Sequence, residues 1–357
     1  MWVRPPADRP KIDPMVRSSP QKDAIQRRRN LASLVALVGS TGVFGLKGFG
    51  ALITGSAVLF SDALESIVNV VAAIFAVFAV RFAAKPADRE HPYGHGKMEH
   101  IAAAFEGGLI SFAAAMIFHT AVRALLSQPE IRSLDMGLGI AAAAALLNLA
   151  LGSWILKEGR ATDSPTLIAD GKHVLADVWT TAGALVGLLL VRLTGLAIFD
   201  PLAALVVGIL LARTGIQLVR DAVHALLDRE DPELLAKLVE AFNEAPMEGM
   251  TGVHRLRALR TGDEVHVDAH IFVPEHWTVK EAHESVLAME KWVTEHSGLV
   301  GELALHLDPC RTEPCARCDL PACQSRRVPY EGSKAVTLDE AVGLAGSWTL
   351  QGGRSSG

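Results

Sequence analysis

Six long apolar stretches dominate the first two thirds of the chain. A helix needs about 20 mostly apolar residues to cross the hydrocarbon core of a bilayer, and each stretch is about that long. They lie near 31–53, 57–82, 101–126, 136–156, 167–191 and 197–219. Because only short polar patches separate them, the pattern predicts an α-helical membrane protein with six transmembrane helices.

The pattern after the sixth stretch is that of an ordinary globular domain. Helical periodicity alternates with period-two segments, and a turn is expected at Gly262. In chain order, the predicted elements are a helix at 232–242, strands at 253–259 and 265–272, a helix at 279–296 and a strand at 302–307. The order helix, strand, strand, helix, strand predicts a small α+β domain.

Composition supports this division of the chain. Of the 357 residues, 50% are apolar and only 20% are charged, whereas a soluble domain carries about a quarter charged residues. We therefore expect four segments. They are a basic cytoplasmic N-terminal segment at 1–30, a six-span transmembrane domain at 31–220, a cytoplasmic domain at 221–309, and a cysteine-containing segment with a disordered tail at 310–357.

Basic residues mark one side of the predicted membrane domain. Arg and Lys are abundant in 1–30 and in the loops after the second and fourth spans, and they are scarce in the other loops. The positive-inside rule therefore places both termini in the cytoplasm and predicts an integral protein of the cell (inner) membrane. The formal net charge of −5 supplies no basic face for nucleic acid, which we exclude as a partner.

Ionisable residues inside the spans point to function, because a charge there is costly unless it faces a cavity, a partner or a metal. The second span carries Glu65 and Asn69 on one helix face, and the fifth carries His173 and Asp177 in the same way. If the two faces meet, these groups suit a divalent transition metal. The alternative is hydrogen bonding between helices, or a helix end in contact with water.

The two spans also share a polar pattern. The copies read Asp62-x-x-Glu65-x-x-x-Asn69 and Asp170-x-x-His173-x-x-x-Asp177. Equivalent points are three spans apart, so the copies run in opposite directions, as in an inverted-topology repeat with a substrate site between its halves. Chance is the alternative for so short a match. Asp62 and Asp170 are further candidate ligands, or supports for ligands.

A second candidate metal site lies in the polar loop between the second and third spans. Two histidines, His91 and His95, and two or three carboxylates fall within a short stretch made flexible by Gly94 and Gly96. Carboxylate and imidazole groups so close together are typical of a loop that collects a metal. An ordinary solvated loop is the competing interpretation.

Together these motifs resemble the cation diffusion facilitator family of metal/proton antiporters. The resemblance rests on Ser-Asp-Ala-Leu-Glu at 61–65, His-Pro-Tyr-Gly-His-Gly-Lys at 91–97 with Glu99 after it, His-x-x-x-Asp at 173–177 and His-Leu-Asp-Pro at 306–309. Order and spacing agree from about residue 30 to 309.

The resemblance implies a homodimer of six-span protomers, each with a transport site between the second and fifth spans. It also implies that the cytoplasmic domain is of the ferredoxin-like, metal-binding type. It further implies a role for particular residues. They are the transport quartet Glu65, Asn69, His173 and Asp177; the loop site Asp88, His91 and His95; the cytoplasmic site His254, His270, His283, His306 and Asp308, with His266 as a further candidate; and an inter-subunit charge interlock of Lys97 and Asp228.

The choice of metal turns on two departures from the family. His or Asp is commoner there at the position of Glu65, and Asp at that of Asn69. A neutral amide oxygen and a longer carboxylate suit a harder ion such as Mn²⁺ or Fe²⁺ better than imidazole would. We expect a divalent transition metal as substrate and regulatory ligand, with Zn²⁺ first and Fe²⁺, Mn²⁺, Co²⁺ or Cd²⁺ as alternatives.

The four cysteines lie close together and stand apart from the family pattern. They are Cys310, Cys315, Cys318 and Cys323. Thiols stay reduced in the cytoplasm, so disulfides are not expected. A central Cys-x-x-Cys directly after His306 and Asp308 predicts a thiolate metal site. The alternative is a weakly structured segment without metal.

These features predict a secondary transporter that exports a divalent transition metal from the cytoplasm in exchange for protons. Its partners would be metal ions, protons, the lipid bilayer and a second copy of the chain. A phosphate loop of the type Gly-x-x-x-x-Gly-Lys-Ser/Thr is lacking, which disfavours an ATP-driven pump, and no enzymatic activity is expected. The alternatives are a membrane-anchored metal sensor and an intramembrane metalloenzyme built on His173 and Asp177.

Overall fold

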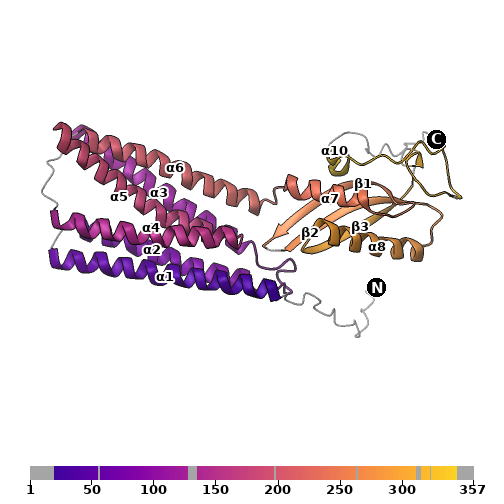
Figure 1. Ribbon diagram of the computed structural model, residues 1–357, viewed down its shortest axis with the longest axis horizontal. Coiled ribbons are helices and arrows are strands. Elements are labelled where there is room, and N and C mark those ends of the chain that lie inside the picture. Colours follow the sequence, from indigo (N-terminus) through magenta and orange to yellow (C-terminus); the bar gives the residue numbers. More distant parts are fainter. Residues whose placement is uncertain are drawn as a thin grey trace, which may run out of the picture. The chain divides into compact units, whose positions relative to one another are not determined.

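The computed structural model contains two compact units (Figure 1). It describes residues 20–54, 57–127, 135–196, 198–262, 264–310, 315–321 and 323–343. The helical unit comprises the chain up to Lys85 and Met98–Val223, and the α+β unit comprises Pro86–Lys97 and the chain from His224 onward. The loop 86–97, which connects two helices of the first unit, therefore belongs to the second.

The helical unit contains the six predicted helices, and successive helices run in alternate directions (Figure 1). They are α1 (Pro20–Thr54), α2 (Ala57–Ala83), α3 (Met98–Ser127), α4 (Asp135–Ala161), α5 (Pro165–Thr194) and α6 (Phe199–Leu226). Within the described residues, α1, α2, α3 and α6 each contain an apolar window long enough to span a membrane. The predicted fold class, a helical membrane domain followed by a small α+β domain, is confirmed.

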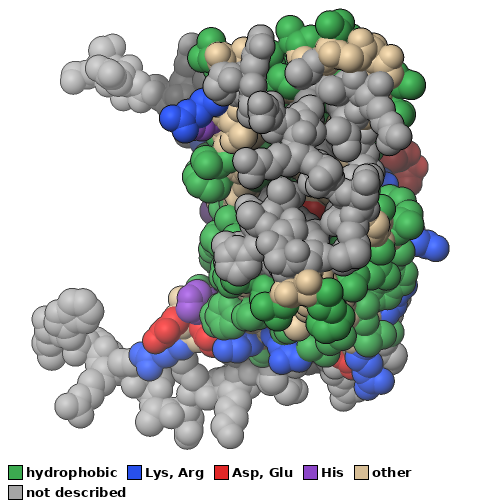
Figure 2. All heavy atoms as spheres, turned by 90° about the vertical axis from the view of Figure 1, so that its left-hand side faces the viewer, with side chains coloured by type: hydrophobic (Ala, Val, Ile, Leu, Met, Phe, Trp, Pro, Cys, Tyr) green, Lys and Arg blue, Asp and Glu red, His purple; other side chains and the backbone are tan. Residues whose placement is uncertain are grey.

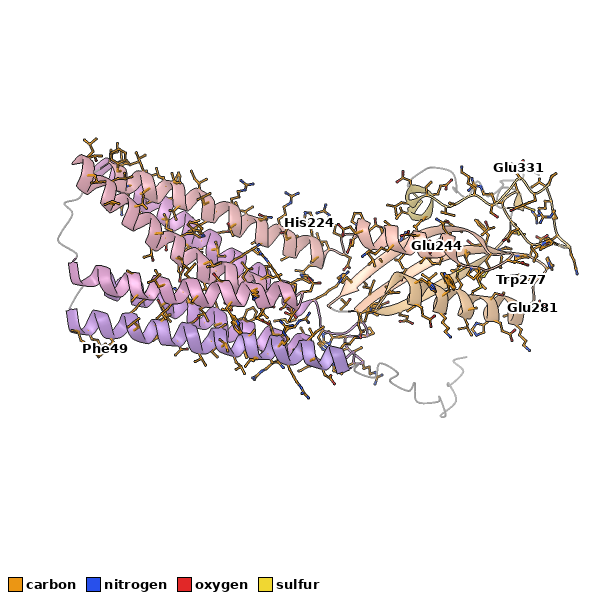
Figure 3. The ribbon with its side chains drawn as sticks, viewed as in Figure 1. Phe49, His224, Glu244, Trp277, Glu281 and Glu331 are labelled. Carbon is orange, nitrogen blue, oxygen red and sulfur yellow. The ribbon has the colours of Figure 1, made fainter. Side chains whose placement is uncertain are left out.

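Hydrophobic side chains cover the outside of the helical unit, as expected for helices in contact with lipid. Val38, Phe112 and Leu126 are each more than two thirds exposed, and Phe49 projects from the end of α1 (Figure 3). Hydrophobic groups also make up most of the described surface at this end of the unit (Figure 2). A water-soluble domain rarely exposes so much contiguous apolar surface.

Small residues allow the helices that carry polar groups to approach closely. A Cβ atom on Gly171 would lie 2.7 Å from the backbone N of Leu156, and one on Gly159 would lie 2.7 Å from the backbone N of Ile168. The backbones of α4 and α5 therefore come close enough to exclude any side chain at these points, as is common between membrane helices. This contact fixes the position of α5.

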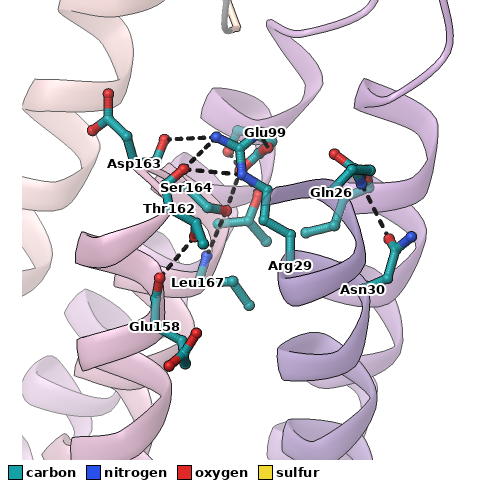
Figure 4. A network of polar contacts seen from close by, with 11 residues as sticks. Gln26, Arg29, Asn30, Glu99, Glu158, Thr162, Asp163, Ser164 and Leu167 are labelled. Atoms are coloured by element: carbon teal, nitrogen blue, oxygen red, sulfur yellow. Dashed lines mark hydrogen bonds and ion pairs between the residues drawn. The ribbon is translucent and has the colours of Figure 1, made fainter. Parts of the chain in front are cut away.

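The start of α5 is held by a buried ionic network (Figure 4). Ser164 precedes the helix, and its hydroxyl accepts a 3.4 Å hydrogen bond from the N–H of Leu167, in the position of an N-cap. The same hydroxyl donates to Glu99 of α3. Glu99 lies 3.5 Å from Arg29 of α1, whose Nε donates to the carbonyl of Thr162 over 3.1 Å. One buried cation thus links α1, α3 and the α4–α5 turn.

The α+β unit has the predicted order of elements. They are α7 (Pro232–Glu244), β1 (Thr251–Thr261), β2 (Glu264–Val273), α8 (Val279–Ser297) and β3 (Gly301–Pro309). The sheet order is β1-β2-β3, with β1 and β2 antiparallel and β2 and β3 parallel. A parallel pair needs a crossover connection, and α8 supplies it.

The core of this unit lies between one face of the sheet and its helices. Val265, Val267, Ala269 and Ile271 alternate along β2 and are buried. The period of two leaves the other face to the polar residues between them. This alternation places the histidines of the strands on one surface of the sheet.

Local capping fixes the start of α8. The Thr278 hydroxyl accepts a 3.3 Å hydrogen bond from the N–H of Glu281, and the Glu281 carboxylate accepts one of 2.8 Å from the N–H of Thr278. Trp277 and Glu281 mark this end of the helix in Figure 3. Gly298 closes the other end with φ of 68°, a conformation that suits glycine.

The prediction of a disordered tail after the cysteines is wrong as far as Gly343. A short helix, α10 (Leu338–Val342), is capped by Thr337 and Glu340. Its Ala341 is fully buried in the core of the α+β unit. The apolar pattern here is only one turn long, too short to be recognised from the sequence, and it is tertiary packing that stabilises the helix. Residues 344–357 lie outside those described.

Candidate metal sites

Three of the predicted ligands meet inside the helical unit. Asn69 of α2 places its Oδ1 2.9 Å from Nε2 of His173 on α5, and its Nδ2 donates to Oδ2 of Asp177. Asn69 and His173 are buried, and Asp177 is partly buried. An amide oxygen, an imidazole nitrogen and a carboxylate therefore converge from two helices, which is a donor set for a divalent cation.

A cavity of about 610 Å³ lies beside these residues, between α2, α3, α5 and α6. Its polar lining includes Asn69, His173 and Asp177 together with Thr120 and Thr180. Most of the other lining residues are apolar. The polar cluster therefore has room for an ion with part of its water shell.

Glu106 of α3 also lies beside this cluster, and it is not among the residues predicted from the sequence. Its Oε2 lies 3.2 Å from Nδ1 of His173, and the residue is only 1% exposed. The contact lacks hydrogen-bond geometry, so neither carboxylate oxygen has a hydrogen-bond partner among the described residues. The available signal was an acidic residue in the predicted span 101–126, because a charge inside a span is costly.

The remaining predicted residues of the membrane site are Asp62, Glu65 and Asp170. Asp62 and Glu65 lie in α2, but their side chains are outside those described. Asp170 lies on α5 one turn before His173 and is buried, with its Oδ2 lacking a hydrogen-bond partner among the described residues. The role of Glu65 as a fourth ligand thus stays a prediction.

The loop residues Asp88, His91 and His95 come together in the α+β unit. One donor atom of each lies within 4.8 Å of the others. Asp88 contacts His91 Nδ1 at 3.3 Å through Oδ1 and His95 Nε2 at 3.4 Å through Oδ2. The N–H groups of His91 and Glu90 also donate to Asp88 and hold the pKa of its carboxyl below the usual value. Asp88 is thus kept ionised and able to ligate a cation.

A row of histidines crosses the outer face of the sheet. His254 of β1 pairs in register with His270 of β2, which pairs with His306 of β3. Oδ2 of Asp308 lies 3.0 Å from Nε2 of His254 and 3.2 Å from Nδ1 of His270. Donor atoms of His254, His270 and Asp308 all lie within 4.8 Å of one another.

The hydrogen bonding of His254 favours a cation in this cluster. Its Nδ1 lies 2.9 Å from the carbonyl oxygen of Gly252, which can only accept, so Nδ1 carries the proton. In the neutral ring, Nε2 then presents a lone pair to the Asp308 carboxylate. Two acceptors facing each other repel unless a proton or a metal ion lies between them.

Asp308 is also held in the charged form needed for a ligand. Burial raises the pKa of its carboxyl, but hydrogen bonds and charge interactions with His270 and His254, which act when these rings carry a proton toward Asp308, outweigh burial. The net effect is a pKa below the usual value.

The other histidines predicted for the cytoplasmic metal site are His306, His283 and His266. His306 Nε2 is 3.6 Å from Oδ1 of Asp308, at its edge. His283 lies exposed on α8, outside the group of converging donor atoms. His266 lies 3.7 Å from Glu302 and against the ring of Tyr93. The structure thus assembles part of the predicted set within one chain.

The four cysteine thiols do not form a group of converging donor atoms within the part of the chain that the structure describes. Cys310, Cys315 and Cys318 are buried, and Cys323 is partly buried. Burial raises the pKa of the Cys315 thiol, but the N–H groups of Arg327 and Val328 and nearby Arg charges outweigh it, so this pKa lies below the usual value. Burial raises the pKa of Cys318.

Lys97 and Asp228 form an ion pair of 2.7 Å within one chain. Their side chains are 35% and 43% exposed, so the pair contributes little to stability by itself. Its predicted role between subunits stays a prediction.

Comparison with known proteins agrees with this architecture. The family pattern described as the cation efflux transmembrane domain matches residues 33–227, and that of the cation efflux protein cytoplasmic domain matches 231–310. An uncharacterised transporter of Synechocystis sp. is 36% identical over 78% of this chain and 89% of its own length. The cation-efflux pumps FieF of Yersinia pestis and Yersinia pseudotuberculosis are each 31% identical over 74% of this chain and 87% of their own length.

The matches therefore extend over both units and nearly the whole length of the relatives. The family consists of transporters rather than enzymes, and its substrates are divalent metal cations. The chain belongs to the cation diffusion facilitator family of cation efflux proteins.

Proposed function

We propose that this protein exports a divalent transition metal ion from the cytoplasm in exchange for protons. The observation that carries the proposal is the convergence of Asn69, His173 and Asp177 inside a bundle whose outer surface is apolar. Glu65 is proposed as the fourth ligand. The metal enters from the cytoplasm, where the positive-inside rule puts both termini, and the protein lies in the inner membrane as a homodimer.

Proton exchange follows from the chemistry of the ligands. Metal ions bind the neutral imidazole and the ionised carboxylate, so metal and proton compete for the same atoms of His173 and Asp177. Binding on the cytoplasmic side releases protons, and protons arriving from the other side displace the metal. A pH gradient can therefore drive the metal uphill without ATP.

Metal flux in proteoliposomes tests this function. The full-length protein is reconstituted, a pH gradient is imposed, and uptake of Zn²⁺, Fe²⁺, Mn²⁺, Co²⁺ and Cd²⁺ is followed with a trapped indicator. We expect uptake of at least one ion that collapses when an ionophore dissipates the gradient. Uptake independent of the gradient would contradict proton exchange, and no uptake of any ion would contradict transport and favour a metal sensor.

We also propose two regulatory metal sites. One is the Asp88 cluster, formed with His91 and His95, and the other is the Asp308 cluster, formed with His254 and His270. Both combine imidazole and carboxylate groups, and both lie in the α+β unit rather than among the helices. Substituting Asp308→Asn is expected to change how the transport rate depends on cytoplasmic metal while leaving the membrane site able to bind it. An unaltered dependence would contradict regulation through this cluster.

A further inference from the structure

Glu106 is a buried acidic residue that is not among the predicted metal ligands. It lies on α3, whereas the predicted ligands lie on α2 and α5. Its carboxylate is shielded from water and has no hydrogen-bond partner among the described residues. A carboxylate so placed is expensive in a membrane protein and is normally retained for a function.

The neighbours of Glu106 show what it can act on. His173 Nδ1 lies 3.2 Å from its Oε2, and the carboxylates of Asp170 and Asp177 lie within electrostatic range. Among the described residues, the only group in ion-pair contact with Glu106 is therefore the imidazole of His173. The other two neighbours repel a negative charge on Glu106, so a cation close by would favour the ionised form of all three carboxylates over their protonation.

The two nitrogens of His173 face opposite partners. Nε2 points to Asn69, where Asp177 also converges, and Nδ1 points to Glu106. A metal-bound imidazole uses one nitrogen for the ion and donates the N–H of the other to an acceptor, commonly a carboxylate. With a metal ion on Nε2, Glu106 is the acceptor in reach of the Nδ1–H.

The charges at the site also favour a supporting role for Glu106 beside His173. Asn69 is neutral, so Asp177 is the one formal negative charge among the three converging groups described. Glu106 adds a negative charge from the far side of the imidazole to those of Asp177 and the proposed ligand Glu65.

We propose that Glu106 is a positioning residue of the membrane metal site. When a metal ion is bound at Nε2 of His173, Glu106 accepts the Nδ1–H, keeps Nε2 directed toward the ion, and compensates for the missing charge at Asn69. The assignment rests on the proposed function in taking His173 as a metal ligand, and it goes beyond that function by adding α3 to the helices that define the site.

Three variants test the proposal in the full-length protein. Glu106→Gln removes the charge, Glu106→Asp keeps it on a shorter side chain, and Glu158→Gln makes the same change on α4, where the carboxylate pairs with Arg28 at the surface. Equilibrium binding of Zn²⁺ and Mn²⁺ is measured in detergent, and the membrane site is identified as the component that His173→Ala removes. Transport rate against metal concentration is measured in proteoliposomes.

Losing a residue that supports a metal-ligating histidine typically weakens metal binding about 10- to 100-fold. We expect Glu106→Gln to raise Kd and KM by that factor while the rate at saturating metal changes less than about threefold. Glu106→Asp should lie between the wild type and Glu106→Gln, and Glu158→Gln should match the wild type. Unchanged Kd and KM in Glu106→Gln, or equal effects of Gln and Asp, would overturn the proposal.

The role of Glu106 can still be decided if a variant does not fold or if the wild type shows no flux. If Glu106→Gln does not fold, Glu106→Asp alone must raise Kd, and a Kd equal to that of the wild type overturns the proposal. If the wild type shows no proton-driven flux, the proposed transport function fails, but the Kd comparison still decides the role of Glu106.

Discussion

At the scale of single residues, His173 and Asp177 are the side chains on which transport should depend most. Each supplies a donor atom that no described neighbour can replace with the same geometry. We expect His173→Ala and Asp177→Ala each to abolish proton-driven metal flux while the protein still elutes as a folded species from size-exclusion chromatography in detergent. Flux at the wild-type level in both variants would rule out the proposed site.

Asn69 should influence which metal is carried. The change Asn69→Asp adds a negative charge where a neutral amide now lies 2.9 Å from His173 Nε2. We expect selectivity to shift toward Zn²⁺ and Cd²⁺ relative to Mn²⁺, measured as competition among these ions in the flux assay. An unchanged order of preference would place Asn69 outside the ligands.

The sequence indicates the converging residues of the candidate membrane site but not the carboxylate that lies behind His173. The spacing of Glu65 and Asn69, and that of His173 and Asp177, is one helical turn. The sequence alone therefore shows that the members of each pair share a helix face. Glu106 was equally visible as a charge in a span, but its relation to His173 depends on how α3 packs against α5. That packing is determined by contacts between helices, and the hydrophobic periodicity of a single helix does not reveal them.

At the scale of elements, the sequence predicted the helices well and their ends poorly. Apolar residues begin near 31, yet α1 begins at Pro20. The additional turns are polar, and Arg28 pairs there with Glu158 of α4 at 2.9 Å. Hydropathy reports only the part of a helix that contacts lipid, whereas hydrogen bonding continues the helix beyond it.

Capping should account for part of the stability of α8. Replacing an N-cap Thr by Ala costs about 1 kcal/mol, so Thr278→Ala should lower the free energy of unfolding of the isolated segment 224–343 by that amount. Lys280→Ala, an exposed change in the same turn, should alter it by less than about 0.5 kcal/mol. Chemical denaturation measures both, and equal effects would contradict the assigned cap.

The same cap gives this segment a dependence on pH. The N–H and hydroxyl of Thr278 lower the pKa of the Glu281 carboxyl in the folded state. A lowered folded-state pKa means that the contribution is complete above the usual Glu value and is lost as the pH falls through the lowered one. The difference in stability between wild type and Glu281→Gln should therefore shrink in acid.

The cysteine segment is expected to behave as packed protein rather than as a metal site. Its thiols do not converge in the described structure, and three of the four are buried. Replacing all four Cys by Ser should leave the number of Zn²⁺ ions bound unchanged, as measured by elemental analysis after dialysis. A loss of one ion per chain would restore the thiolate site predicted from the sequence.

At the scale of the whole molecule, the sheet cluster is expected to couple metal binding to assembly. The ligand atoms of His254, His270 and Asp308 come from three different strands, so an ion ties the sheet together. Metal that binds only the folded, assembled form stabilises that form. Adding Zn²⁺ should lower the dimer dissociation constant of segment 224–343 in sedimentation experiments, and His270→Ala should remove most of this effect. A dimer dissociation constant that does not change with Zn²⁺ would contradict the coupling.

The connectivity of the two units has a mechanical consequence. Because residues 86–97 belong to the α+β unit, the chain passes between the units at 85/86, 97/98 and 223/224. The α+β unit is thus joined to the helical unit by three chain crossings, at the ends of α2 and α6 and at the start of α3. We expect a movement of this unit to act on those helix ends. Two of these helices carry Asn69 and Glu106, so a force transmitted through the three crossings would reach the helices of the proposed metal site.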